Sequence, residues 1–350
     1  MILLKGDFLF KPKFNYTEKI VNNLTFITES NCIILNTPHI QEWEEKLQKE
    51  TLLRRAHSST AIEGNLLSLN QVTELSDNHS VMAMRKDKQE VLNYIEALNR
   101  IPDFASKDRF ELNDLLEIHK ILTKETLENP EDEGFLRNCQ VFVVDSEGSV
   151  VYTPPDSDEV LNLINEFLDW FNSDISINPI ITAGLVHCEL VRVHPFFEGN
   201  GIIARFMAIL FLCKQGFDSK RFFALDDYYN MNRHRYYDTL QSVNQDNLNS
   251  TKWLEYFTEG MVFTMESIRE KVIELNKDIE SLKEEDHDSL NERQKEIVEK
   301  IKANGRINNK DIREMFSISN TTARKDTNQL VNLNVIIKKG KGKNTYYILA

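Results

Sequence analysis

The chain contains few cysteines, and they lie far apart. Only Cys32, Cys139, Cys188 and Cys213 occur among its 350 residues. None is spaced like a zinc-binding pair, and nothing in their positions indicates disulfides. Cys188 and Cys213 fall inside apolar helical runs, where a small buried thiol is the simplest explanation. The sequence therefore gives no indication of a disulfide framework or a cysteine metal centre.

Long hydrophobic runs are also missing. The longest uninterrupted apolar run, Phe206 to Cys213, stops at Lys214, far short of the roughly 20 residues that a membrane span needs. Residues 1–14 mix charged residues into apolar ones and lack the separated regions of a signal peptide. With 41% hydrophobic and 28% charged residues, the composition is that of a globular chain rather than a disordered one. We expect a cytoplasmic protein.

An excess of positive charge is absent except at the C-terminal end. The net charge is −13, yet residues 291–350 hold 13 Lys and Arg against 6 Asp and Glu. The preceding residues hold 29 basic and 49 acidic side chains. Length alone does not choose between one domain and two. The uneven charge indicates two modules with different partners.

Helical spacing of apolar residues dominates from Gln41 to Glu280, so we predict a mainly α fold. The main exception is Arg137 to Thr153, where two valine-rich segments flank Asp145-Ser146-Glu147-Gly148 and predict a β-hairpin. An amphipathic helix is predicted from Ile268 to Leu282. The charged run at residues 283–288 follows, and it is either a linker or an exposed helix end.

The C-terminal residues predict three short helices, Gln294–Ala303, Lys310–Phe316 and Asn320–Leu333, the last with Asn320 or Thr321 as N-cap. A hairpin with a lysine-rich tip follows at residues 335–349. This order is similar to a winged helix-turn-helix domain, in which the third helix enters the DNA major groove. The groove-facing side chains would be Arg324, Lys325 and Asn328. Use of the same fold for protein contacts stays open.

The most informative segment runs from His194 to Arg205 and reads HPFFEGNGIIAR. Apolar runs on both sides predict a tight turn between two buried helices. Gly199 and Gly201 allow the backbone to come close to a ligand. The first N–H groups of the second helix, together with its dipole, favour an anion. The turn is therefore a candidate phosphate cradle.

This segment resembles the signature of the Fic (filamentation induced by cAMP) family, whose members mostly transfer AMP from ATP to a protein hydroxyl. The family pattern is His-Pro-Phe-x-(Asp or Glu)-Gly-Asn-Gly-Arg-x-x-Arg. The chain matches it at eight positions: His194, Pro195, Phe196, Glu198, Gly199, Asn200, Gly201 and Arg205. It departs at Ile202, where the family usually has the first of its two arginines.

The resemblance implies a role for each signature residue. His194 would be the base that takes the target hydroxyl's proton, and Glu198 would hold Mg²⁺. Arg205 would reach the terminal phosphate. The α- and β-phosphates would lie on a cradle made by Asn200 and the amides of Gly199, Gly201 and Ile202. The structural alternatives are a capping or core histidine, a solvated carboxylate and an ordinary tight turn.

The isoleucine at position 202 removes a cation from this arrangement. A charged hydrogen bond contributes about 1.5–3 kcal/mol, or roughly tenfold to more than a hundredfold in affinity or rate. The sequence therefore leaves three outcomes open: a slow transferase, a preference for another nucleotide, or a site that only binds.

Further resemblances lie on both sides of the signature. Tyr237 and Asn244, seven residues apart on one helix face, resemble the family's adenine and ribose contacts, although a packed tyrosine and a surface asparagine would look the same. Upstream, Ser59 and Glu63 match the family's inhibitory pattern (Ser or Thr)-x-x-x-Glu-(Gly or Asn). The resemblance implies that Glu63 pairs with Arg205. The hairpin resembles the family's flap, which would hold a target segment by main-chain pairing.

Taken together, the sequence predicts a helical Fic-domain bundle with a β-hairpin flap and a small C-terminal winged-helix domain. The predicted boundaries are 1–110 for an N-terminal region with the inhibitory helix around 45–64, 111–265 for the Fic domain, 266–290 for a helical linker and 291–350 for the winged helix. The implied activity is autoinhibited AMP transfer from ATP, with Mg²⁺, to a Ser, Thr or Tyr hydroxyl of an unidentified protein and of the chain itself. The rival hypothesis is a nucleotide-sensing DNA-binding regulator, and self-association stays open.

Overall fold

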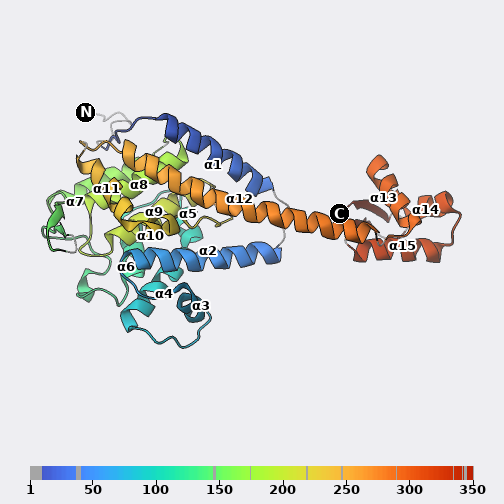
Figure 1. Cartoon of the computed structure of the whole chain (residues 1–350), viewed down its shortest axis with the longest axis horizontal. Helices are drawn as coiled ribbons and strands as arrows, with labels where there is room; N and C mark the ends of the chain where they lie inside the picture. The colour runs from blue at the N-terminus through green and yellow to red at the C-terminus, as the bar shows by residue number, and fades with distance from the viewer. Residues whose placement is uncertain are drawn as a thin grey trace. The chain divides into compact units, whose positions relative to one another are not determined.

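The structure is a computed structural model that describes residues 10–36, 41–144, 147–173, 175–217, 220–245, 247–288, 290–333, 335–340, 342 and 345–349. The chain divides into two compact units, Met1–Lys271 and Val272–Ala350, and each is described by itself. The predicted mainly helical fold with a small hairpin is confirmed (Figure 1).

The first unit is a layered helical bundle whose elements follow one another with short connections. They are α1 (Glu18–Asn36), α2 (Gln41–Ile62), α3 (Leu69–Ser76), α4 (Arg85–Asn99), α5 (Ile101–Ala105), α6 (Leu112–Thr123), the 3₁₀ turn η1 (Pro130–Asp132), β1 (Val143–Val144), β2 (Val150–Tyr152), α7 (Val160–Phe171), α8 (Pro179–Val193), α9 (Asn200–Lys214), α10 (Leu225–Met231), α11 (Arg233–Gln245) and the start of α12 (Thr251–Asp288).

Helices α8 and α9 form the centre of this unit, as the two flanking apolar runs predict. Nearly every side chain of both helices is buried, so neither has a polar face and each must pack on all sides. Gly184 of α8 makes room for α12, because a Cβ there would lie 2.7 Å from Leu254 Cδ2. Trp253 donates its indole N–H to the Gly184 carbonyl at 2.7 Å. The loop between α8 and α9 is therefore held between two fixed helices.

Helix α2 lies along α10 and is fixed there by polar contacts. Ser58 donates to Asp227 Oδ1 at 2.6 Å, and Arg54 pairs with Asp227 Oδ2 at 2.6 Å. The helix ends at Ile62, so Glu63 lies on the turn that follows it rather than inside the predicted 45–64 helix. Gly64 ends the turn with φ +101°, a conformation that suits glycine.

The sequence analysis missed helix α1. Its residues include many Asn, Thr, Ser and β-branched side chains, which are weak helix formers. Tertiary packing compensates, since Ile20, Ile27 and Ile34 recur every seven residues and are all buried. Asn23 donates to Thr258 Oγ1 at 3.0 Å, which places α1 beside the first half of α12 (Figure 1).

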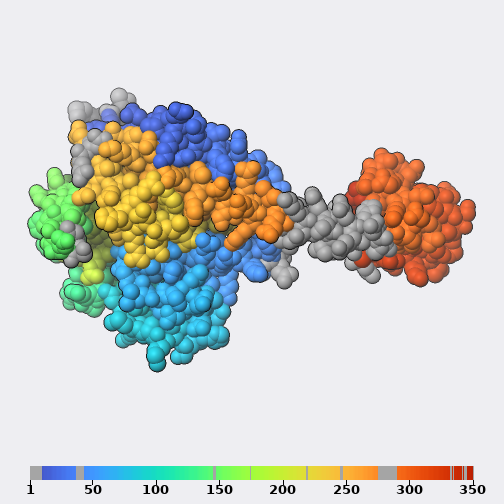
Figure 2. Space-filling view, viewed as in Figure 1, coloured from blue at the N-terminus to red at the C-terminus, as the bar shows by residue number. Residues whose placement is uncertain are grey.

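The predicted hairpin is present but short. Val143 pairs with Tyr152 and Val144 with Val150 in an antiparallel ladder with one irregularity. Asp145 and Ser146, part of the predicted turn, lie outside the described residues. Gln241 of α11 donates to the Val151 carbonyl at 2.9 Å, and Figure 2 shows the green hairpin segment on the surface of the first unit. Val144 and Val150 leave more than half of their surface exposed.

The second unit holds the end of α12, followed by α13 (Glu292–Asn304), β3 (Ile307–Asn308), α14 (Asn309–Phe316), α15 (Asn320–Asn332), β4 (Ile336–Lys339) and β5 (Tyr346–Leu349). The three strands form an antiparallel sheet in the order β3-β5-β4. A compact apolar core joins the helices to the sheet, with Ile297, Ile312 and Leu330 fully buried. This is the predicted winged-helix arrangement.

One detail of the second unit differs from the sequence prediction, and one alternative that the sequence left open is decided. Ser319, rather than Asn320 or Thr321, caps α15, because its hydroxyl accepts from the Thr322 N–H at 3.2 Å. The charged run at 283–288 belongs to α12, which continues without a break to Asp288. Among the described residues, no helix has the length and apolar character required to cross a membrane.

Candidate active site

The signature loop, residues 194–199, is fixed at both ends by left-handed backbone conformations. His194 ends α8 with φ 50°, and Gly199 precedes α9 with φ 78°. The Asn200 side chain closes the loop on itself, accepting from the Phe196 N–H at 2.9 Å and donating to the Phe196 carbonyl at 2.8 Å. The side-chain amide of Asn200 therefore holds the signature loop together. The sequence prediction was that Asn200 forms part of the phosphate cradle.

The His194 ring has one nitrogen fixed by the backbone. Its Nδ1 lies 3.3 Å from the Val191 carbonyl, and a carbonyl only accepts, so Nδ1 carries the proton in this contact. Nε2 then keeps its lone pair. Burial lowers the pKa of His194 to about 4, with the Val191 hydrogen bond opposing the shift. At neutral pH the imidazole is therefore uncharged and able to accept a proton.

Arg137 is buried and holds the loop from the side of the hairpin. Its guanidinium donates to backbone carbonyls on both sides, including His194 at 2.8 Å and Pro155 at 2.5 Å. Nη1 also donates to the Cys139 carbonyl at 3.2 Å, and the backbone N–H of Arg137 donates to the Pro195 carbonyl at 2.9 Å. Burial lowers the pKa of this arginine. The side chain thus joins the signature loop to both ends of the hairpin segment.

His119 of α6 lies against the same loop on another side. Its ring stacks on Phe196 with centroids 3.7 Å apart and planes 3° apart. Nδ1 accepts from the Gly134 N–H at 3.0 Å, and Nε2 lies 3.0 Å from the Glu198 carbonyl. Burial lowers the pKa of His119 to about 4.

The first turn of α9 carries the amides of the candidate phosphate cradle. Ile202 is 6% exposed and packs into the core. A Cβ on Gly201 would lie 2.5 Å from Glu63 Oε1. The Glu63 carboxylate therefore lies at the helix N-terminus, where the dipole and unpaired N–H groups favour an anion.

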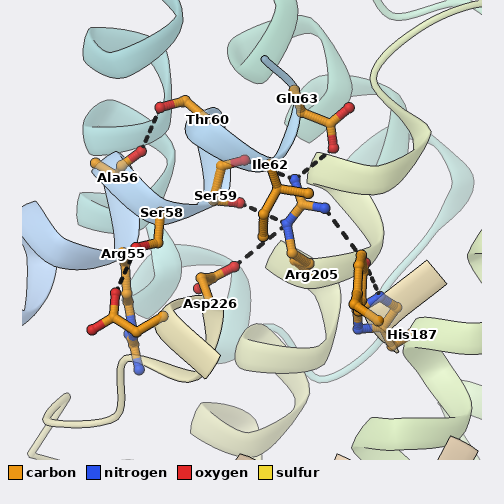
Figure 3. Close-up of polar contacts among 12 residues, drawn as sticks. Arg55, Ala56, Ser58, Ser59, Thr60, Ile62, Glu63, His187, Arg205 and Asp226 are labelled. Atoms are coloured by element: carbon orange, nitrogen blue, oxygen red, sulfur yellow. Dashed lines mark hydrogen bonds and ion pairs between the residues drawn. The ribbon is translucent and has the colours of Figure 1, made fainter. Parts of the chain in front are cut away.

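Arg205 lies deeper and is almost completely enclosed, and Figure 3 shows its polar contacts with Ser59, Glu63 and Asp226. Its guanidinium donates to Glu63 Oε1 at 2.7 Å, to the Ser59 hydroxyl at 2.8 Å and to the Ser59 carbonyl at 3.0 Å. Asp226 lies 3.4 Å from Nε, and the Tyr236 hydroxyl lies 3.4 Å from Nη1.

The charge on Arg205 is secured by these neighbours. Burial by itself would lower the pKa of Arg205, but Glu63, Tyr236 and Asp226 raise it well above its ordinary value. The guanidinium side chain is 1% exposed, whereas that of Glu63 is 38% exposed. Glu63 is therefore the partner of Arg205 that faces solvent.

The remaining predicted site residues lie at the edge of this arrangement. Glu198 is exposed, and its carboxylate makes no hydrogen bond or ion pair to the described residues. Tyr237 is half exposed and donates to the Ile62 carbonyl at 3.3 Å, next to Glu63. Asn244 is partly buried on α11, and its side chain makes no hydrogen bond within the described ranges.

A metal site can be tested against these donors. The described residues contain no cluster of three or more His, Cys, Asp or Glu side chains. Among the described residues of the signature loop, Glu198 is a hard oxygen ligand whose carboxylate makes no hydrogen bond or ion pair. Mg²⁺ commonly takes one or two carboxylates and fills its other positions with phosphate oxygens and water. One free carboxylate fits a metal that arrives with a nucleotide, not a resident one.

Two known domain families match parts of the chain. Residues 109–212 match the Fic/DOC family, and residues 293–344 match the DeoR-like helix-turn-helix domain. The chain carries a Fic/DOC domain and a DeoR-like helix-turn-helix domain. The Fic match begins just before α6 and ends inside α9, so it contains the hairpin and the signature loop.

Several curated proteins resemble the Fic part of the chain. The chain is 31% identical over 179 residues to protein adenylyltransferase fic-1 of Caenorhabditis elegans, covering 49% of this chain and 34% of that protein. It is 28% identical over 210 residues to protein adenylyltransferase Fic of Aedes aegypti, covering 58% of this chain and 39% of that protein. The chain thus spans little more than a third of either relative.

Solved structures extend the likeness in fold to both units. A Fic family protein from Desulfovibrio desulfuricans G20 superposes with a TM-score of 0.65 over 97% of this chain and 98% of its own, at 22% identity. Fic-1 of C. elegans superposes with a TM-score of 0.58 over 74% of this chain and 72% of that chain, at 24% identity.

Sequence reasoning missed several residues that shape the Fic site: His119, Asp226 and Tyr236, and the loop-holding role of Arg137. His119 lies on α6 in line with the buried Leu115 and Leu122. A polar side chain at a core position of an amphipathic helix is the signal that could have marked it.

Proposed function

We propose that this protein transfers AMP from ATP to a Ser, Thr or Tyr hydroxyl of a target protein, and to itself, and that Glu63 restrains the reaction. The observation that carries the proposal is the orientation of His194. Because Nδ1 faces the Val191 carbonyl at 3.3 Å, Nε2 is left as a proton acceptor beside the phosphate cradle. The curated relatives are named protein adenylyltransferases, which supports the same reaction class.

In this reaction the target hydroxyl oxygen bonds to the α-phosphorus of ATP, and the bond from that phosphorus to the pyrophosphate oxygen breaks. His194 takes the hydroxyl proton at Nε2. Its neutral state at cellular pH follows from its burial, which lowers its pKa to about 4. The left-handed backbone of His194 and the carbonyl contact from Arg137 keep the ring in one place during the step.

The phosphates would lie on the amides of Gly199, Gly201 and Ile202 at the start of α9, with Arg205 as the cation for the terminal phosphate. Glu198 would hold the Mg²⁺ that enters with ATP. That metal, when bound, neutralises charge on the phosphate oxygens. Tyr237 and Asn244 on α11 would contact the adenine and ribose.

Glu63 would restrain the site by charge and by position. Its carboxylate lies 2.7 Å from Arg205 Nη2 and pairs with it. The terminal phosphate needs the same cation. The Glu63 carboxylate also lies against Gly201, where a phosphate on the cradle would meet a second negative charge. Two anions at one helix N-terminus repel each other, so Glu63 must leave before the terminal phosphate can pair with Arg205.

Intact-mass spectrometry after incubation with ATP and Mg²⁺ tests this proposal. The expected result is an AMP adduct on Glu63→Gly, little on the wild type and none on Glu63→Gly/His194→Ala. Glu63→Gln is the matched variant, since it keeps the shape of the side chain and loses the charge. If Glu63→Gly binds ATP but carries no adduct, AMP transfer is wrong. Adducts that survive His194→Ala would remove His194 from the role of base.

A specific observation favours a second function, DNA binding by the helix-turn-helix domain. One face of α15 exposes Arg324, Lys325 and Asn328, which line a shallow surface groove together with Asn320, Thr321 and Gln329. A salt titration of duplex DNA binding should show affinity falling steeply with ionic strength, because phosphate contacts release counterions. Arg324→Ala/Lys325→Ala should flatten that dependence. If the affinity for DNA does not change with ionic strength, the domain is assigned to protein contacts instead.

A further inference from the structure

His119 is a second histidine at the signature loop, and its two ring nitrogens are both occupied. The Gly134 N–H can only donate, so Nδ1 must accept it at 3.0 Å. The Glu198 carbonyl can only accept, so Nε2 must donate to it at 3.0 Å. The two backbone groups therefore fix one neutral tautomer, and the ring has no nitrogen left for a substrate.

Two glycines pack closely against α6 around this side chain. Gly134 has φ +78°, and a Cβ there would lie 3.0 Å from Lys120 Cβ and 3.1 Å from the Leu116 carbonyl oxygen. Gly199 also has φ +78°, and its Cβ would lie 2.9 Å from Thr123 Cγ2 and 3.3 Å from His119 Nε2. Both approaches need glycine. The segment leading into the hairpin and the signature loop thus meet adjacent turns of α6.

We propose that His119 is a positioning residue that links the segment leading into the hairpin to the signature loop and so sets the place of Glu198 relative to a bound target. It acts through its contacts with the Gly134 N–H, the Glu198 carbonyl and the face of Phe196. Arg137 makes a comparable link farther along the loop, at His194 and Pro195. His119 and Arg137 together restrict the movement of the signature loop relative to the hairpin.

The consequence for catalysis follows from what the linked elements carry. Glu198 provides the free carboxylate at the loop, and the hairpin would present the target hydroxyl. A shift of one relative to the other would misplace the hydroxyl against the phosphate, and small misplacements are costly in such reactions. This consequence rests on the proposed AMP transfer, whereas the structural link does not.

Three substitutions separate the two hydrogen bonds from the stacking. His119→Phe keeps a flat ring on Phe196 and loses both bonds. The Asn side chain in His119→Asn can still accept near the Nδ1 position, and the Gln side chain in His119→Gln can still donate near the Nε2 position. Asn172→Ala is the matched control, because Asn172 also joins two segments through two backbone bonds, to the Phe110 N–H at 2.7 Å and carbonyl at 2.8 Å, outside the site.

Amide hydrogen exchange provides the readout that does not depend on activity. In His119→Phe the Gly134 amide should exchange about fivefold faster or more, the effect of losing one neutral hydrogen bond. His119→Asn should restore part of that protection, and His119→Gln should not. Asn172→Ala should lower thermal stability without changing Gly134. Unchanged Gly134 exchange in His119→Phe would overturn the link.

Self-labelling in the Glu63→Gly background provides the second readout. His119→Phe should raise the Mg²⁺ concentration for half-maximal labelling about fivefold, and His119→Gln, which keeps the bond to the Glu198 carbonyl, should bring it back toward the parent value. Equal labelling parameters in His119→Phe and Asn172→Ala would reduce His119 to a stabilising residue. If Glu63→Gly itself does not label, AMP transfer has failed, and the Gly134 exchange alone decides the positioning role. If His119→Phe does not fold, the Asn and Gln variants, each keeping one bond, take its place.

Discussion

Arg205 and Glu198 come from the same signature, yet they lie in opposite environments. Arg205 is enclosed, with Ser59, Glu63, Asp226 and Tyr236 around its guanidinium. Glu198 is exposed and without a partner among the described residues. The site is therefore closed around its cation, Arg205, and open at the exposed carboxylate of Glu198. A restraint placed on the cation can act without disturbing the carboxylate, and this is where Glu63 lies.

The largest expected difference between the two ends is in stability. Arg205→Gln should lower the free energy of unfolding by about 3–5 kcal/mol, because it removes a buried cation that pairs with both Glu63 and the buried Asp226 carboxylate. Glu198→Gln should change it by less than about 0.5 kcal/mol, as for an exposed surface residue. Urea denaturation of both variants measures the contrast. Similar losses for the two would show that the enclosure of Arg205 contributes little.

A second prediction concerns Ile202, which lies between the two ends and is buried. Ile202→Arg should cost about 1–3 kcal/mol of stability, because a larger charged side chain enters a packed site. In the Glu63→Gly background the same change should tighten ATP binding about tenfold, the effect of one charged hydrogen bond. Calorimetric titration checks this, with Ile202→Leu as control. A gain of affinity in the control as well would assign the effect to packing.

A third prediction uses His187, which is buried behind Arg205 in contact with the Tyr236 hydroxyl at 2.9 Å. Burial, and then the charge of Arg205, lower its pKa well below 6.5. The folded state therefore binds fewer protons than the unfolded state below pH 6.5, so stability is present above that pH and is lost as pH falls.

Replacing His187 should reveal this dependence. His187→Gln should reduce the slope of unfolding free energy against pH, between pH 6 and 5, by about 1.4 kcal/mol per pH unit. His234→Gln, at an exposed histidine of α11, is the control substitution. An unchanged slope in His187→Gln would mean that His187 does not stay neutral in the folded state.

The smallest expected effect belongs to Tyr236. Tyr236→Phe removes the hydroxyl that lies between Arg205 and His187 and should weaken ATP binding by less than about tenfold in the Glu63→Gly background. AMP binding should not change, since AMP lacks the phosphate that Arg205 would contact. Tyr229→Phe is the matched control, because Tyr229 stacks on Tyr236 and its hydroxyl has no hydrogen-bond partner among the described residues. Equal losses for ATP and AMP would place the effect of Tyr236 at the nucleoside instead.

The sequence predicted some parts of this site and could not predict others. The signature loop between two buried helices followed from local evidence, because the glycines and the flanking apolar runs are adjacent in the chain. His119 and Arg137 reach the loop from 79 and 57 residues away, and their roles depend on how α6 and the hairpin segment pack. Helix α1 was missed for a related reason, since its packing against α12 overrides weak local propensity.

The position of Glu63 just beyond the end of α2 determines how quickly the cation could be freed. Helix α2 is held by Ser58 and Arg54 on Asp227 and by Ser59 on Arg205, and none of these contacts involves Glu63. A Cβ on the following Gly64 would meet no atom within 4 Å. Release therefore needs a rotation of one partly exposed side chain, a motion of picoseconds to nanoseconds, rather than the slower local unfolding of a helix. The ion pair between Glu63 and Arg205 would therefore break and re-form rapidly. Binding of a terminal phosphate would depend on the fraction of time for which Arg205 is not paired with Glu63.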